Sequence, residues 1–332
     1  MRVLVTGGAG YIGSITTRWL LDAGFTVVVL DSLVRGHREA VDDRARFVEA
    51  DVSDAPAVRD AADGCDAVLH CAGYIEVAES QADPALYVEN NLRRPVAMMD
   101  ALVEAGVGTI VFSSTAATYG EPESIPIAED ARTNPVNVYG ATKLAFERVL
   151  DWYGTAHGVR SVRLRYFNVA GAWPDGSLGE AHEPETHIVP RILGSIARGT
   201  RTFEVYGNDY PTRDGTCVRD YIHVCDLADA HRRALEHAVS GGTGVFNLGN
   251  GQGFTNLEVV RACGEACGEE VDITFGPRRS GDPATLVASA TRARDALEWC
   301  PAHPGIETIV ADAWRWHEAH PSGYHSLAKM VE

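Results

Sequence analysis

Tyr139 and Lys143 are the residues whose types and spacing point most directly to catalysis. They stand four positions apart, which puts both side chains on one face of a helix. Tyrosine titrates near about 10, and an ammonium group about 4 Å away contributes on the order of 4 kcal/mol at an effective dielectric of about 20. The pair therefore predicts a general base whose pKa is lowered by Lys143. The alternative is an exposed helical pair.

The rarity of lysine strengthens this prediction. Only two of the 29 basic residues are lysines, and one of them is Lys143. An ammonium group is a more compact point charge than a guanidinium group. The sequence thus indicates that this position requires an ammonium group.

A run of hydroxyl side chains, Ser113 to Thr115, follows the apolar segment 109–112. Ligands of parallel sheets bind outside the carboxyl ends of the strands. A hydroxyl group in this place is suited to share the reacting proton with Tyr139. The alternative is a cap at the end of a strand.

Three glycines near the start, Gly7, Gly10 and Gly13, link an apolar run to a helical pattern. Glycines in this context permit a tight turn and let backbone N–H groups approach a pyrophosphate at a helix N-terminus. Asp31 ends the next apolar run, and a carboxylate there accepts hydrogen bonds from a ribose and repels a 2′-phosphate. NAD is therefore the expected cofactor, although Arg35 is close by.

Short apolar segments alternate with helical patterns through the first half of the chain. The expected strands are 2–5, 26–30, 46–48, 67–69, 109–112 and 161–164. This alternation predicts an α/β fold with a Rossmann-type doubly wound parallel sheet. We expect a dinucleotide-binding domain over 1–170, with returning elements around 217–248, and a smaller, interleaved α/β substrate domain mainly over 171–332.

Composition excludes several classes of protein. Asp and Glu number 46 against 29 Lys and Arg, a net charge of −17, which argues against binding to nucleic acid or to an anionic membrane. No apolar run approaches the roughly 18 residues of a membrane span. The seven cysteines include no Cys-x-x-Cys pair, and no His/Asp/Glu cluster has metal-ligand spacing. We expect a cytoplasmic protein without a metal site.

The chain resembles the extended short-chain dehydrogenase/reductase family, and within it the UDP-glucose 4-epimerases. The resemblance covers nearly the whole chain. The segments that carry it are 7–13, 70–80, 112–120, 139–143, 165–172, 206–224 and 278–288. It implies a homodimer that uses NAD to interconvert UDP-glucose and UDP-galactose through a transient 4-keto intermediate.

The resemblance also implies a role for individual residues. Tyr139, Lys143 and Thr115 are the expected catalytic residues, with Tyr139 as the base for the 4-hydroxyl group. The expected cofactor contacts are Gly7, Gly10, Tyr11, Ile12, Gly13, Asp31, Asp51, Val52, Cys71, Ala72, Gly73, Asn90, Ser113, Tyr139, Lys143 and Tyr166. The expected substrate contacts are Thr115, Asn168, His187, Tyr206, Arg219, Tyr221, Arg279, Asp282 and Leu286.

Other activities on the same fold remain open from the sequence. A nucleotide-sugar dehydratase needs an acid and a base after the threonine, where this chain has Ala116 and Ala117. A 4-epimerase of UDP-N-acetylglucosamine, UDP-xylose, UDP-glucuronate or a natural-product hexose is the closer alternative, because Leu286 is intermediate in size at the position that limits the sugar. A non-catalytic NAD-binding protein is disfavoured by the retained Tyr139 and Lys143.

Overall fold

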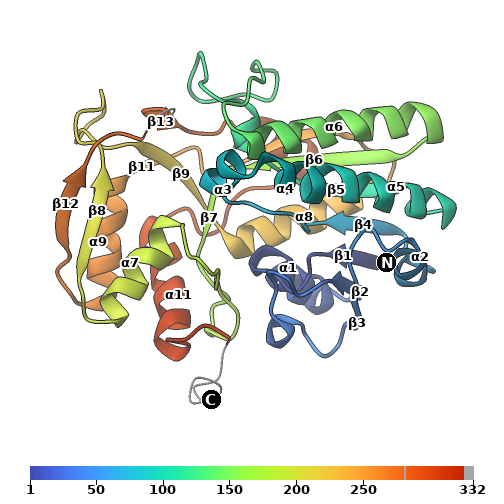
Figure 1. Ribbon diagram of the computed structural model, residues 1–332, viewed down its shortest axis with the longest axis horizontal. Helices are drawn as coiled ribbons and strands as arrows, with labels where there is room; N and C mark the ends of the chain where they lie inside the picture. Colours follow the sequence, from blue (N-terminus) through green and yellow to red (C-terminus); the bar gives the residue numbers. More distant parts are fainter. Residues whose placement is uncertain (280–281, 325–332) are drawn as a thin grey trace.

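A parallel sheet forms the centre of the molecule (Figure 1). The computed structural model describes residues 1–279 and 282–324. Within them, seven strands pair in the order β3-β2-β1-β4-β5-β6-β10. Their bounds are β1 (Arg2–Thr6), β2 (Thr26–Asp31), β3 (Arg46–Glu49), β4 (Ala67–His70), β5 (Thr109–Thr115), β6 (Arg160–Tyr166) and β10 (Gly244–Leu248). The order reverses between β1 and β4, which opens a crevice at their carboxyl ends. The predicted doubly wound α/β fold is confirmed.

Helices cover both faces of this sheet. Val3 and Val5 of β1 pack on one face, whereas Leu4 between them packs on the other, as the alternation of a strand requires. One face carries α1 (Tyr11–Asp22), α8 (Val224–Val239) and α10 (Thr291–Leu297). The opposite face carries α2 (Ala55–Ala62), α5 (Arg94–Glu104) and α6 (Val138–His157).

Short helical segments connect these layers. They are η1 (Arg38–Ala40), α3 (Val77–Ala82), α4 (Pro84–Val88), the π-helical η2 (Glu89–Arg93) and η3 (Ala116–Thr118). The segments α3, α4 and η2 follow β4, and η3 follows β5. They therefore lie at the carboxyl edge of the sheet, next to the crevice.

A second, smaller group of elements packs around its own core (Figure 1). One small sheet contains β7 (Asn168–Ala170), β9 (Val218–His223), β11 (Gly253–Thr255) and β13 (Thr285–Leu286). Beside it lie the strand pair β8 (Thr202–Tyr206) and β12 (Asp272–Gly276), and the helices α7 (Ile188–Ala197), α9 (Asn256–Cys267) and α11 (Ile306–Ala319). Of the segment expected to return to the first sheet, α8 and β10 do so, whereas β9 is the centre of the second sheet.

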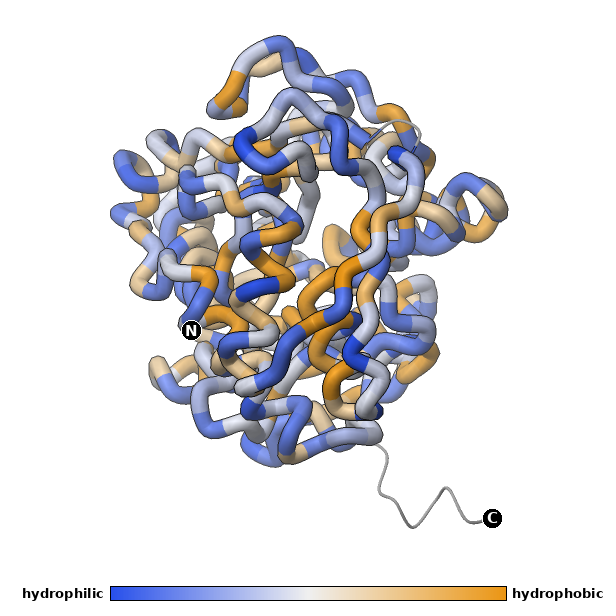
Figure 2. Tube along the Cα trace, turned by 90° about the vertical axis from the view of Figure 1, so that its left-hand side faces the viewer, coloured by the Kyte–Doolittle hydropathy of each residue, from blue (hydrophilic) through white to orange (hydrophobic). Residues whose placement is uncertain are grey.

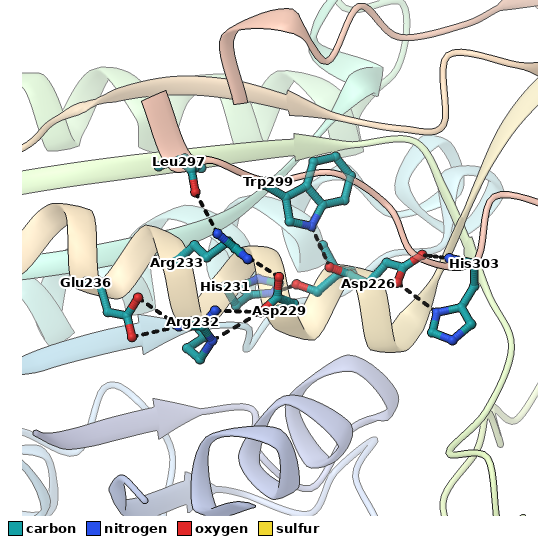
Figure 3. A network of polar contacts seen from close by, with 10 residues as sticks. Asp226, Asp229, His231, Arg232, Arg233, Glu236, Leu297, Trp299 and His303 are labelled. Atoms are coloured by element: carbon teal, nitrogen blue, oxygen red, sulfur yellow. Dashed lines mark hydrogen bonds and ion pairs between the residues drawn. The ribbon is translucent and has the colours of Figure 1, made fainter. Parts of the chain in front are cut away.

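Polar contacts fasten α8 to the segment that follows α10 (Figure 3). Trp299 Nε1 donates to the carbonyl oxygen of Asp226 at 2.9 Å, and His303 contacts both carboxylate oxygens of Asp226 at 2.8 Å. Arg233 donates to the carbonyl oxygen of Leu297 at 3.3 Å. The late part of the chain is thereby joined to the face of the first sheet.

The hydropathy of the chain differs between the interior and the outer loops (Figure 2). Hydrophobic runs cross the middle of the molecule, and many of the outer loops are hydrophilic. In the described part of the chain, no helix combines the length and apolar character needed to cross a membrane. All seven cysteines are free thiols.

His231 on α8 is buried between helix and sheet without charge compensation. Its Nε2 atom lies 2.9 Å from Ser113 Oγ, and its Nδ1 atom lies 2.9 Å from the carbonyl oxygen of Leu227. Burial lowers the pKa of His231 to about 4. A neutral imidazole is therefore part of the folded core.

We expect His231→Gln to reduce the loss of unfolding free energy that occurs as the pH falls. Between pH 6.5 and 4 the unfolded chain binds more protons at this residue than the folded chain, so the folded state loses stability as the pH falls. The loss attributable to His231 is up to about 3 kcal/mol. Urea unfolding of both proteins at pH 7, 6, 5 and 4 measures it. His157 is exposed, and His157→Gln is the control. If the stability of His231→Gln fell with pH as steeply as that of the wild type, the loss could not be assigned to His231.

Candidate active site

A cavity of about 1460 Å³ lies between the carboxyl edge of the main sheet and the second group of elements. This volume exceeds the roughly 300–1,000 Å³ of a typical small-molecule site, so the cavity has room for more than one ligand. Every residue predicted to bind cofactor or substrate lines it, with the exception of Ser113. The structure thus brings together residues that span the chain from Gly7 to Leu286.

The glycine turn leaves the start of α1 open to the cavity. Gly10 is the N-cap residue; no side chain caps this helix, and its first turn has no acidic residue. A Cβ atom on Gly13 would lie 2.1 Å from the carbonyl oxygen of Gly7, so only glycine permits this close turn. Free N–H groups at a positive helix end suit an anionic pyrophosphate.

Asp31 occupies the end of β2, beside this turn. Its carboxylate accepts one hydrogen bond from Ala9 N and one from Leu33 N, both at 2.9 Å, and burial raises its pKa. Arg35 also lines the cavity, where it pairs with Glu79 at 2.8 Å. The carboxylate of Asp31 therefore suits recognition of ribose hydroxyl groups, and the ion pair with Glu79 engages the guanidinium group of Arg35.

The other predicted cofactor contacts lie along the same wall. Asp51 pairs with Arg94 at 2.6 Å, and Asn90 donates to the carbonyl oxygen of Leu86 at 2.9 Å. The further residues placed on the cavity wall are Tyr11, Ile12, Val52, Cys71, Ala72, Gly73 and Tyr166. Burial raises the pKa of the Cys71 thiol to about 11, which leaves that group unreactive near neutral pH.

Ser113 is the one predicted cofactor contact that does not line the cavity. Its side chain lies behind Cys71, 3.2 Å from that sulfur atom and 2.9 Å from His231 Nε2. It is buried and absent from the cavity wall. The hydroxyl group of Ser113 lies between β5 and α8, and its carbonyl oxygen accepts a hydrogen bond from Lys143 Nζ.

Tyr139 stands in the first turn of α6. Asn137 caps this helix by accepting a hydrogen bond from Gly140 N at 2.7 Å. A Cβ atom on Gly140 would lie 2.5 Å from the carbonyl oxygen of Ala117, so the glycine lets α6 begin directly against η3. This contact holds Tyr139 beside Thr115 at the end of β5.

The electrostatics of this group differ from the sequence-based expectation. Burial raises the pKa of Tyr139, and a hydrogen bond with Thr115 opposes that rise. The ammonium group of Lys143 instead donates to the carbonyl oxygen of Ser113 at 3.1 Å, and burial lowers its pKa to about 8. Desolvation therefore outweighs the predicted effect of Lys143 on the phenol in the protein alone.

We expect Thr115→Val to lower kcat by about 10-fold or more, while the affinity for UDP stays within a factor of two of the wild type. The substitution removes the hydrogen bond that opposes the high pKa of Tyr139, so the rate profile also moves to higher pH. Steady-state kinetics against pH and calorimetric titration with UDP measure the two effects. A kcat within a factor of two of the wild type would remove the role of Thr115.

The second half of the cavity carries the predicted nucleotide contacts. Arg219 forms an ion pair with Asp282, and the guanidinium group of Arg279 lies 4.1 Å from the ring centre of Tyr206. Asn168 donates to the carbonyl oxygen of Asp220 at 3.1 Å. Two oriented arginines on one wall form a site suited to a diphosphate.

The remaining predicted contacts close this half of the cavity. Tyr221 is buried, and burial raises its pKa. Leu286 packs beside Tyr119 and Ile127. His187 also lines the cavity, but its imidazole ring is paired with Glu180. Glu180, His182 and Glu185 also line the cavity and were not predicted, although the repeated Glu-x-His pattern was a visible signal in the sequence.

Comparison with known proteins places the chain in a family. The sequence model of the NAD dependent epimerase/dehydratase family matches residues 3–249. The chain belongs to this family. The resemblance noted from the sequence is thereby confirmed.

The relatives match over their full length. A protein of Lacticaseibacillus casei named UDP-glucose 4-epimerase is 51% identical over 98% of this chain and 99% of its own length. The crystal structure of UDP-glucose 4-epimerase from Brucella ovis, in complex with NAD, is 43% identical, with a TM-score of 0.91 over 94% of this chain and 97% of that one. The enzyme from Bifidobacterium longum, in complex with NAD+ and UDP, is 35% identical, with a TM-score of 0.91 over 98% and 100% of the two chains.

Proposed function

We propose that this chain is an NAD-dependent enzyme that interconverts UDP-glucose and UDP-galactose through a transient 4-keto sugar. One observation carries the proposal: Thr115, Tyr139 and Lys143 lie in a single cavity between the glycine turn and the arginines of the second half. The full-length similarity to proteins named UDP-glucose 4-epimerase supports the same activity.

The dinucleotide fits the first half of the cavity. The uncapped start of α1 receives its pyrophosphate, and Asp31 receives the hydroxyl groups of its adenosine ribose. Lys143 lies beside the predicted position of the nicotinamide ribose. The chemistry that bound NAD supplies is the reversible acceptance of hydride from C4 of the sugar.

The side chains of the protein handle the proton and hold the substrate. Tyr139 takes the proton of the 4-hydroxyl group and later returns it, while Thr115 orients the phenol. Because the phenol alone is too weak an acid near neutral pH, its ionisation needs positive charge in the assembled site. Arg219 and Arg279 bind the diphosphate throughout, which leaves the sugar free to present either face.

A dehydratase is disfavoured by the surroundings of Thr115. Ala116 and Ala117 form η3 directly after it and offer neither an acid nor a base. A 4-epimerase of another UDP-sugar differs in the sugar pocket, where Leu286 lies. Substrate preference therefore distinguishes a UDP-galactose 4-epimerase from a 4-epimerase of another UDP-sugar.

A panel of UDP-sugars tests the activity. We expect UDP-galactose to have a higher kcat/KM than UDP-N-acetylglucosamine, UDP-xylose and UDP-glucuronate when product formation is followed by chromatography. A higher value for one of the other three sugars would assign the enzyme to that sugar. Failure of all four would overturn the proposal.

A homodimer in the cytoplasm is part of the proposal. Trp152 on α6 is 67% exposed and Val88 on α4 is 38% exposed, which leaves apolar surface for a partner. The free thiols accord with a reducing compartment. Light scattering of the purified protein is expected to give about twice the 35.7 kDa of the chain.

A further inference from the structure

Four side chains between β7 and α7 gather their potential ligand atoms in one small volume. They are Glu180, His182, Glu185 and His187, and their atoms all lie within 4.8 Å of one another. We propose that these four residues bind a divalent transition-metal ion, with Zn²⁺ as the best match. We expected no metal site from the sequence, and this ion would bind to these residues whichever sugar the enzyme accepts.

The sequence of this segment contains the ligand pattern twice. Glu180-Ala-His182 and Glu185-Thr-His187 are two Glu-x-His units separated by Glu183 and Pro184. The segment bends at these two residues, and the second unit thereby faces the first. Each unit supplies one carboxylate and one imidazole group, so the chain offers a two-nitrogen, two-oxygen ligand set.

The separations between the ligand atoms suit a tetrahedral ion. Zn²⁺ binds nitrogen and oxygen ligands at about 2.0–2.2 Å, which places tetrahedral ligands roughly 3.3–3.6 Å apart. His182 Nδ1 lies 3.2 Å from Glu180 Oε1 and 3.6 Å from Glu185 Oε2. His187 Nδ1 lies 4.0 Å from Glu185 Oε1 and is in contact with Glu180. Small side-chain movements bring all four to coordination distance.

The Nδ1 atom of His182 provides a second, independent indication. This nitrogen is buried and makes no hydrogen bond, although two carboxylate groups lie within 3.6 Å of it. A buried polar atom without a partner is costly. An ion placed between the imidazole and the carboxylates satisfies this atom.

The charges of the cluster also suit a bound cation. Glu180 is buried, and in the described part of the chain the ion-pair partners of Glu180 and Glu185 are His182 and His187, with no lysine or arginine among them. A divalent ion neutralises both carboxylates while the histidines bind as neutral rings. Imidazole ligands favour Zn²⁺ and its neighbours over Mg²⁺ and Ca²⁺, which prefer oxygen alone.

The location suggests what the ion does. Trp316 Nε1 donates to the carbonyl oxygen of Glu180 at 3.1 Å, and the ring of Tyr11 lies edge-on to His182 with 6.5 Å between centres. All four ligands line the cavity. The ion therefore fixes residues 180–187 as one wall of the cavity, and His187 serves the metal in place of its predicted contact with the substrate.

Metal content tests the site directly. The full chain without a histidine tag is treated with a chelator, dialysed, and titrated with Zn²⁺ by calorimetry, with bound zinc counted by plasma mass spectrometry. We expect about one tightly bound Zn²⁺ per chain. Replacement with Co²⁺ is expected to produce the intense visible absorption of a four-coordinate site.

Single substitutions separate this cluster from other histidines. We expect His182→Gln and Glu185→Gln to weaken Zn²⁺ binding by more than about 100-fold, the upper end of what the loss of an outer-shell partner costs, and His157→Gln to leave it unchanged. Glu185 is partly exposed, so its variant retains the fold if His182→Gln does not. Wild-type protein with less than about 0.1 bound zinc, or equal affinity in all variants, would overturn the proposal.

Discussion

Replacement of Tyr139 by phenylalanine is expected to reduce kcat by about 10²–10⁴-fold, the range that a positioned acid or base contributes. The substitution removes only the hydroxyl oxygen from a buried ring at the start of α6. The proposed diphosphate contacts, Arg219 and Arg279, line the same cavity and are not altered by the substitution. UDP should therefore bind with the affinity of the wild type.

A second tyrosine on the same helix provides the control for this experiment. Tyr153 donates to Asp100 at 2.5 Å and lies outside the cavity. Tyr153→Phe should retain kcat within a factor of two of the wild type. Turnover by Tyr139→Phe at a similar level would show that another group moves the proton of the sugar.

Loss of the Arg165 side chain is expected to cause the largest change in stability. The guanidinium group of Arg165 holds Glu147 through two hydrogen bonds, at 2.9 and 2.5 Å, and the two side chains are only 6% and 4% exposed. Ser114 also donates to Glu147 at 2.6 Å. Arg165→Met leaves a buried carboxylate without its cation, which costs about 3–5 kcal/mol.

Urea unfolding measures this loss of stability, and two further variants show whether the unpaired charge causes it. The double variant Glu147→Met with Arg165→Met removes both charges and should recover much of the stability, because the penalty arises from the unpaired charge. Arg93→Met breaks an exposed pair with Glu89 and should cost less than about 1 kcal/mol. A loss below about 1 kcal/mol in Arg165→Met would contradict the assignment.

The features that short segments determine were predictable from the sequence. Alternation of apolar strands and amphipathic helices predicts the doubly wound sheet, and the spacing of Gly7, Gly10 and Gly13 predicts the turn at its edge. Asp31, Thr115 and Tyr139 follow from their places at strand ends and on a helix. The cavity lined by all of them agrees with that reasoning.

Other features depend on packing that spacing cannot reveal. In the protein alone, burial, which the sequence does not give, raises the pKa of Tyr139 and so opposes the lowering predicted for it. The hydroxyl group of Ser113 does not line the cavity; it forms a hydrogen bond with His231, which is more than a hundred positions away in the sequence. The approach of Glu180 and His182 to His187 depends on a bend in an irregular segment, for which no periodic pattern exists.

Above all, we propose that this chain converts UDP-galactose to UDP-glucose with NAD retained in the cavity. The purified protein is incubated with UDP-galactose, with no NAD added, and UDP-glucose is followed by chromatography. We predict conversion to an equilibrium mixture of the two sugars. Absence of UDP-glucose, both without and with added NAD, would contradict the account.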